Sequence, residues 1–468
     1  MANQDEKKTT RTVNPATNIT EQEFENTSDE QLKTVFENAN DAFHLWKSTP
    51  MGERANLLKK VSELMSERAE ELARLCSIEM GKRFVEAMGE IKVCIGILDY
   101  YAENGKEILK DKPIDTPEGK AFIAYEPIGV IFSVQPWNFP FYQVIRSAAP
   151  HIMAGNTYVL KHAANVPQCA LAIEKLFTDA LAPEGVFTNI FTTGPKASEL
   201  IANEHIKGVT FTGSEKAGAS LATEAGKHLK KTVLELGGSD PCIILDESDI
   251  DETVKMVAME RLSNAGQVCT SPKRIIVLET VADEFIEKAK SIYENVKVGN
   301  PLDDDTELPP LKSVDAMEKV LDQVNETVKA GARLVYGGKR LGNTEGAFMQ
   351  PTILTDIKPG MLAYSEEIFG PVLSIYAVKD IDEAVKLAND TRFGLGGTVI
   401  CRDEDKAVEV ARMIDSGMVY INHVTTSVAF LPFGGVKKSG YGRELHHEGM
   451  KEFTNQKLIR ISSPDADF

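Results

Sequence analysis

The sequence contains no long hydrophobic run and no apolar leader. No stretch of about 18 apolar residues, which a membrane-spanning helix requires, occurs among its 468 residues. Residues 1–13 are polar and lack the apolar centre of a secretory signal. We therefore expect a cytoplasmic protein without a membrane span.

Cysteine and histidine are scarce and scattered. The six cysteines form no CxxC pair, and the eight histidines form no HExxH motif or Cys/His cluster. Such spacing predicts neither a disulfide framework nor a metal site. The cysteines are therefore interpreted as reduced thiols, most of them small buried side chains.

Positive charge is in the minority. Lys and Arg number 52 against 70 Asp and Glu, so the formal net charge is −18. Nucleic-acid binding depends on clustered cations, and we do not expect it here. The hydrophobic share of 42% and the charged share of 26% are typical of a globular protein. The chain length predicts two or three structural units.

The sequence does contain a clear change of pattern near residue 122. Before it, apolar residues recur at helical spacing, Ser28 with Gln31 forms a capping box, and residues 57–75 predict a second long helix. After it, short β-branched runs alternate with helical stretches, as in parallel sheets covered on both faces. The runs are 128–134, 157–160, 186–191, 209–212 and 233–236, then 243–245, 275–278, 373–378, 398–401 and 419–422. The pattern predicts an α/β fold with two α/β domains in tandem.

Cys269 differs from the other cysteines in its neighbours. It follows a glycine-containing turn in residues 264–270 (NAGQVCT) and is flanked by small and polar side chains. This setting would leave the sulfur open to a ligand, as a nucleophile requires. Inert packing, the usual role of a cysteine, stays open as the alternative.

Two further polar residues end predicted strands. Glu235 precedes two glycines, which let a substrate approach the backbone closely, so it could serve as a general base. Asn138 lies between Pro136 and Pro140, and its amide could donate a hydrogen bond to an oxyanion. A salt bridge for Glu235 and a structural turn for Asn138 are the alternatives.

Residues 211–218 (FTGSEKAG) lead from a predicted strand into a predicted helix. Gly213 and Ser214 would leave free N–H groups and the helix dipole for a phosphate. The segment lacks the GxGxxG fingerprint of dinucleotide sites, so by itself it is a weak signal.

Several motifs together resemble the aldehyde dehydrogenase superfamily, over about residues 14–456. In order, they contain Asn138 (PWNFP), Glu235 (ELGGSDP), Cys269 (NAGQVC), Glu367 and Phe369 (EEIFGPV), and residues 432–440 (PFGGVKKSG). The resemblance implies that Cys269 attacks an aldehyde and that Asn138 holds the oxyanion. Hydride transfer then leaves a thioester, which water activated by Glu235 hydrolyses.

The resemblance also implies a nicotinamide cofactor, NAD or NADP. The residues that match its binding positions are Trp137, Lys161, Gly213, Ser214, Glu367 and Phe369. Relatives that prefer NAD often carry a glutamate three residues after the lysine, where Ala164 stands here. Because no acid at this position repels a 2′-phosphate, the choice between the two cofactors stays open.

The substrate implied by the resemblance is an aldehyde that carries a carboxylate. Arg146, eight residues after Asn138, and Ser427 match carboxylate contacts of a bacterial subgroup similar to succinate-semialdehyde dehydrogenases. A second arginine of that subgroup is missing, because Ser263 stands in its place. Arg261 is nearby in sequence but need not point the same way. A helix-surface salt bridge is the alternative for Arg146.

The implied fold is a Rossmann-type cofactor domain, an α/β catalytic domain and a small β oligomerisation arm. We assign residues 1–108 and 128–238 to the NAD(P)-binding domain, 239–445 to the catalytic domain, and 109–127 with 446–468 to the arm. Exposed strand edges in the arm predict a homodimer or homotetramer. Acyl transfer to coenzyme A or phosphate and a catalytically silent scaffold are the alternatives, although Cys269 and Glu235 are both present.

Overall fold

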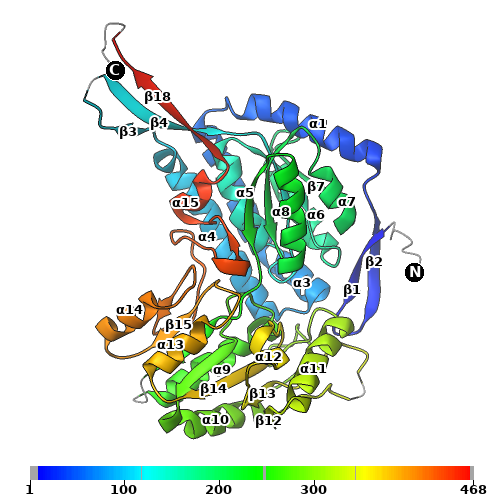
Figure 1. Ribbon diagram of the computed structural model, residues 1–468. Helices are drawn as coiled ribbons and strands as arrows, with labels where there is room; N and C mark the ends of the chain where they lie inside the picture. The colour runs from blue at the N-terminus through cyan, green and yellow to red at the C-terminus, as the bar shows by residue number, and fades with distance from the viewer. Residues whose placement is uncertain (1–8, 118, 246–248, 343, 464–468) are drawn as a thin grey trace.

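The computed structural model describes residues 9–117, 119–245, 249–342 and 344–463. Two helix-covered sheets lie one above the other in Figure 1, and a narrow three-stranded sheet projects from them. Two stretches with sequence predictions lie outside the described residues. They are residues 1–8, which belong to the segment predicted not to be a secretory signal, and residues 464–468 of the predicted arm. Within the described ranges, no helix is both long and apolar enough to span a bilayer.

The described chain begins with a β-hairpin and four helices. These are β1 (Thr9–Asn14), β2 (Ile19–Glu25), α1 (Asp29–Trp46), α2 (Met51–Glu67), α3 (Ala69–Met80) and α4 (Phe84–Ile108). The predicted capping box of Ser28 and Gln31 is confirmed. The single helix predicted over residues 57–75 is wrong, because the backbone leaves helical geometry at Arg68 between α2 and α3.

The first large sheet has the strand order β17-β9-β8-β5-β6-β7. Its parallel strands are β5 (Val130–Val134), β6 (Thr157–Lys161), β7 (Phe187–Ile190), β8 (Ile206–Thr212) and β9 (Lys231–Glu235), with β17 (Gly440–Tyr441) as an antiparallel edge. Its helices include α5 (Tyr142–Ala154), α6 (Pro167–Asp179), α7 (Gly194–Leu200) and α8 (Glu215–Lys227). Ile131 and Phe132 belong to different core clusters, so both faces of the sheet are buried.

The second large sheet has the order β12-β13-β14-β11-β10-β15-β16, and only β12 runs antiparallel to its neighbour. Its strands are β10 (Pro241–Ile244), β11 (Arg274–Leu278), β12 (Arg333–Tyr336), β13 (Thr352–Thr355), β14 (Val372–Val378), β15 (Thr398–Ile400) and β16 (Tyr420–Ile421). Its helices are α9 (Ile250–Leu262), α10 (Glu279–Glu294), α11 (Val314–Lys329), α12 (Leu362–Ser365), α13 (Ile381–Asn389) and α14 (Glu404–Arg412). The predicted α/β class is confirmed.

The projecting sheet joins two distant parts of the chain. It pairs β18 (Thr454–Ile461) with β4 (Lys120–Pro127) and β4 with β3 (Lys112–Ile114), all antiparallel (Figure 1). Before reaching it, the chain passes through β17 and α15 (His446–Lys451). Because β17 pairs with β9, the segment just before residue 445 lies in the first sheet rather than in the second.

Candidate active site

The loop that carries Cys269 begins with a left-handed turn. The short helix η1 (Ser263–Gly266) has positive φ at Asn264 (49°), Ala265 (54°) and Gly266 (72°). This geometry costs a non-glycine residue about 1–2 kcal/mol, so other contacts must maintain it. A Cβ at Gly266 would collide with the carbonyl oxygen of Gly370, so this position requires glycine.

The side chain of Asn264 ties this turn to the loop that follows β5. Its amide donates to the carbonyl oxygen of Asn138 at 2.9 Å. In return, Asn138 Nδ2 donates to the carbonyl oxygen of Gln267 at 3.0 Å. An amide nitrogen carries two hydrogens, so Asn138 keeps one N–H for another acceptor. The two loops predicted to carry the nucleophile and the oxyanion donor are thus bonded to each other.

Cys269 is partly exposed, whereas the other five cysteines are buried, and all six are free thiols. Burial raises the pKa of the Cys269 thiol to about 11. Lys273 opposes this shift most strongly and Arg146 acts in the same direction, because both are cations. The nearby positive charges therefore oppose, without cancelling, the rise in the pKa of this thiol.

Glu235 ends β9 and has no polar partner in the part of the chain that the structure describes. Its side chain is buried, with the residue 2% exposed, and neither carboxylate oxygen has a hydrogen-bond partner. Burial raises the pKa of Glu235 well above its usual range, Arg146 opposes the shift, and Glu444 adds to it. The predicted salt-bridge alternative does not describe this carboxyl. A buried carboxyl of raised pKa can take up and release a proton.

Two of the residues predicted to hold the cofactor, Ser214 and Lys161, lie at the ends of strands of the first large sheet. Ser214 is the N-cap of α8 and its side chain accepts from Ala217 N at 3.4 Å, so the helix N-terminus faces the end of β8. Lys161 ends β6 and is 9% exposed, and burial lowers the pKa of its ammonium to about 8. The expected free N–H of Gly213 is wrong, because this group donates to the carbonyl oxygen of Glu235 at 2.9 Å. The N-terminus of α8 and the Lys161 ammonium, at the ends of two strands separated by β5, still fit the phosphates of a dinucleotide.

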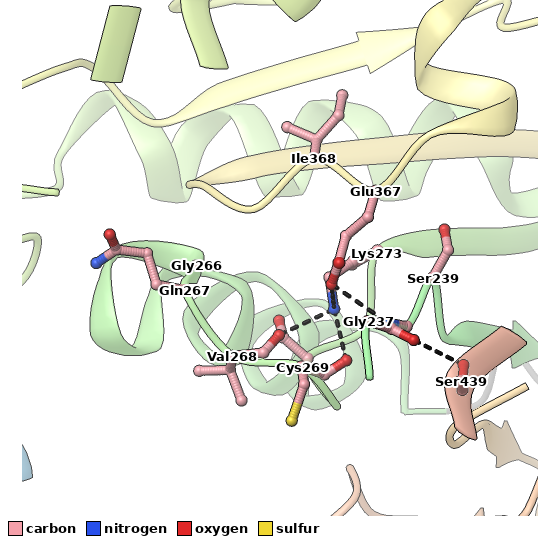
Figure 2. Close-up of polar contacts among 12 residues, drawn as sticks. Gly237, Ser239, Gly266, Gln267, Val268, Cys269, Lys273, Glu367, Ile368 and Ser439 are labelled. Atoms are coloured by element: carbon pink, nitrogen blue, oxygen red, sulfur yellow. Dashed lines mark hydrogen bonds and ion pairs between the residues drawn. The ribbon is translucent and has the colours of Figure 1, made fainter. Parts of the chain in front are cut away.

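The other cofactor candidates form an aromatic and acidic corner. The rings of Trp137 and Phe369 meet edge to face with centroids 6.0 Å apart. Glu367 accepts from Gly238 N at 3.3 Å and pairs with Lys273 at 3.2 Å. Figure 2 shows this carboxylate, the lysine and the Cys269 loop side by side. An aromatic wall beside a carboxylate suits a nicotinamide riboside.

Arg146 is buried and bonded to other protein groups. Its guanidinium pairs with Glu444 and donates to the Tyr142 hydroxyl at 3.3 Å and to Thr212 Oγ1 at 3.3 Å. Ser427 lies near the same tyrosine and opposes the rise in pKa that burial causes in its hydroxyl. The helix-surface alternative for Arg146 is therefore wrong, because the residue is 1% exposed.

Arg261 has a structural role. Its guanidinium donates to five acceptors, of which four are backbone carbonyl oxygens: Val372, Gly266, Ile368 and Gly370, with Ser271 Oγ as the fifth. These acceptors lie on the loop of Glu367 and on the loop of Cys269. Arg261 thus fixes both loops and does not replace the arginine that is missing at Ser263.

Three residues of the site belong to none of the motifs found in the sequence. Lys273 follows the nucleophile loop, Tyr142 lies one helical turn before Arg146, and Glu444 comes from the segment after β17. The i, i+4 spacing of Tyr142 and Arg146 is the only local signal that could have found one of them. Among the described residues, no cluster of three or more His, Cys, Asp or Glu side chains could hold a metal ion.

The fold and these side chains define an α/β protein of the dehydrogenase type, with two large sheets, a partly exposed thiol on Cys269 and a buried carboxyl on Glu235. The chain belongs to the aldehyde dehydrogenase family, whose model matches residues 2–459. It is 49% identical to the succinate-semialdehyde dehydrogenase [NADP(+)] of Deinococcus radiodurans, over 96% of this chain and 94% of that protein.

The Mycobacterium tuberculosis succinate-semialdehyde dehydrogenase [NADP(+)] 1 is 40% identical, over 96% of this chain and 99% of that protein. The crystal structure of succinic semialdehyde dehydrogenase from Streptococcus pyogenes in complex with NADP+ is 43% identical. It aligns with a TM-score of 0.95 over 97% of this chain and 100% of that one. The predicted family is confirmed.

Proposed function

We propose that this protein oxidises succinic semialdehyde to succinate with NADP+. The observation that carries the proposal is the buried Arg146 beside Tyr142 and Ser427, with the charge of Arg146 felt by both Cys269 and Glu235. A guanidinium so placed can receive the carboxylate of a short aldehyde acid while its carbonyl carbon reaches the thiol. The names of the relatives agree with this substrate.

In the proposed reaction, the Cys269 thiolate adds to the aldehyde carbon. The free N–H of Asn138 and the backbone N–H of Cys269 hold the oxyanion, and loss of one such donor typically costs about 3 kcal/mol of barrier. A nicotinamide cofactor held by Trp137, Ser214 and Glu367 would supply the hydride acceptor. Glu235 then takes a proton from the water that hydrolyses the thioester on Cys269.

Arg146 keeps unused hydrogen-bond donors although it pairs with Glu444. The guanidinium has five N–H groups. On its two terminal nitrogens, the hydrogen bonds to Tyr142 and Thr212 engage one N–H each, while Nε pairs with Glu444 without a hydrogen bond. Two N–H groups are left for a carboxylate. Glu444 therefore fixes the orientation of Arg146 without using all of its donors.

NADP use is proposed because the strand end at Lys161 carries no acid in the position that would oppose a 2′-phosphate, where Ala164 stands. The pairing of Ala164 O with Arg11 N at 3.3 Å brings β1 to the same edge. We further propose that the protein works in the cytoplasm, where its six free thiols would stay reduced.

The substrate proposal is tested with two aldehydes of equal carbon number, succinic semialdehyde and butanal, each with NADP+ and NAD+. We expect kcat/KM to be much higher for succinic semialdehyde than for butanal, and higher with NADP+ than with NAD+. Ser427→Ala should raise KM for succinic semialdehyde about fivefold through loss of one hydrogen bond and leave butanal unchanged. Equal turnover of both aldehydes by the unaltered protein would contradict a carboxylate pocket.

A further inference from the structure

Lys273 lies at the meeting point of the nucleophile loop and the Glu367 carboxylate. It follows Cys269 by four residues and precedes β11, and its side chain is 4% exposed. Its backbone N–H donates to Asp240 O at 3.0 Å, which fixes the start of β11 against the segment before β10. The backbone of Lys273 is thus fixed at the point where its side chain begins.

The ammonium of Lys273 uses all three of its N–H groups within the protein. It donates to the carbonyl oxygens of Val268 at 2.9 Å and Cys269 at 2.7 Å, and it pairs with Glu367 Oε1 at 3.2 Å. In Figure 2 these three contacts converge on the nitrogen, and the Cys269 sulfur points to the other side of the loop. Two successive carbonyl groups are thereby turned away from the sulfur.

We propose that Lys273 is a positioning residue that orients the Cys269 loop and supplies the cation that keeps its thiol reactive, with Glu367 tempering that charge. This role rests on the proposed nucleophile. Lys273 itself touches neither the substrate nor the reacting atoms. Turning the carbonyl of Cys269 toward the ammonium also fixes the direction of the peptide groups on either side of it.

The charges that face the sulfur come from four parts of the fold. Lys273 and Arg146 of α5 favour the thiolate, whereas Asp240 before β10 and Glu367 after α12 oppose it. Of these four, Lys273 has the largest influence. Removing its charge should therefore raise the pKa of the thiol, and removing the charge of Glu367 should lower it.

The test measures alkylation of Cys269 by iodoacetamide against pH in the cofactor-free protein, with the Cys269 peptide quantified by mass spectrometry. We expect Lys273→Met to move the midpoint upward by about one pH unit, and so to slow alkylation about tenfold below both midpoints. Lys273→Arg should restore most of this rate, and Glu367→Gln should shift the midpoint downward. Lys290→Met, on the surface of α10, is the matched control for loss of one positive charge.

An unchanged midpoint in both Lys273→Met and Glu367→Gln would overturn the proposal, even if Lys273→Met lowered the thermal midpoint, because that result describes a purely structural lysine. If Lys273→Met does not fold, the alkylation midpoint of Glu367→Gln tests the proposal by itself. Alkylation reports the thiolate and not turnover. A protein that oxidised aldehydes without Cys269 would thus refute the proposed function while leaving the Lys273 result interpretable.

Discussion

At the scale of single residues, burial changes the acidity of Glu235, the base in the proposed reaction. Its carboxylate oxygens have no protein partner among the described residues, and burial raises its pKa well above that of a free glutamate. The base acts only when deprotonated. Activity should therefore fall, as pH is lowered, at a higher pH than the ordinary glutamate pKa of about 4.3 would give.

Glu235→Gln should separate thioester formation from its hydrolysis. We expect a burst of one reduced cofactor per site followed by a steady rate lowered about 100-fold or more, because an amide cannot take the proton from water. Stopped-flow absorbance of the reduced cofactor measures both phases. The steady rate that remains should lose the pH dependence of the unaltered protein; a full steady rate without a burst would assign the base elsewhere.

The sequence identified the residues whose motifs are local and missed those whose partners are distant. Asn138, Glu235 and Cys269 were predicted from their own neighbours and from the resemblance, and their chemical roles stay predictions. Glu444 could not be connected with Arg146, because the two are brought together only by the return of the chain through β17. Arg261 likewise took its direction from backbone carbonyl groups on another loop.

At the scale of elements, α4 supports both catalytic loops through two glutamates one turn apart. Glu90 Oε1 accepts from Phe141 N at 2.8 Å and Tyr142 N at 2.9 Å, where α5 begins after Asn138. Glu86 Oε1 accepts from Asn264 N at 3.2 Å, in the turn before Cys269. The helix therefore fixes the spacing between the two loops.

The buried partner of Glu90 makes this support testable. Lys82 pairs with Glu90 Oε2, and its ammonium lies 3.6 Å from the centroid of the Phe139 ring. Lys82→Met should cost about 3–5 kcal/mol of unfolding free energy, because it leaves a buried charge unpaired. Urea unfolding measures this loss. In the same experiment, Lys329→Met, which breaks an exposed pair with Glu326, should cost at most about 1 kcal/mol.

Combining Lys82→Met with Glu90→Gln should recover part of the loss, since no charge is then left buried. Additive losses would show that the two residues act independently. The double variant should still lower kcat more than it raises KM, because Glu90→Gln weakens the bonds that place Asn138.

Some strands were predictable from their apolar residues, and others were not. β5, β6 and β11 each contain at least three successive apolar or aromatic residues, which the sequence shows directly. β2 is exposed along nearly its whole length and has no apolar pattern to detect, whereas β12 has a short apolar run that is half exposed. These strands are stabilised by pairing with a neighbour rather than by their own burial.

At the scale of the whole molecule, one face of the three-stranded arm exposes large apolar side chains beside Lys112 and Arg460. The register aligns Leu458 with Ile123 and places Ile114 two residues along the same face. Leu458 is 62% exposed and Ile114 is 38% exposed, although both are large and apolar. The outer edges of β18 and β3 are also the ends of the sheet, and such edges pair readily with another chain.

We therefore expect the arm to join copies of this chain, so that the mass in solution is a multiple of 51.4 kDa. Light scattering after gel filtration measures it. Leu458→Lys combined with Ile114→Lys should shift the population toward the single chain, because charge replaces the apolar contact. The arm lies away from Cys269, so the iodoacetamide reaction of that thiol should be unchanged in the same variant. A protein of single-chain mass before any substitution would remove the assembly role from the arm and leave its apolar face to another partner.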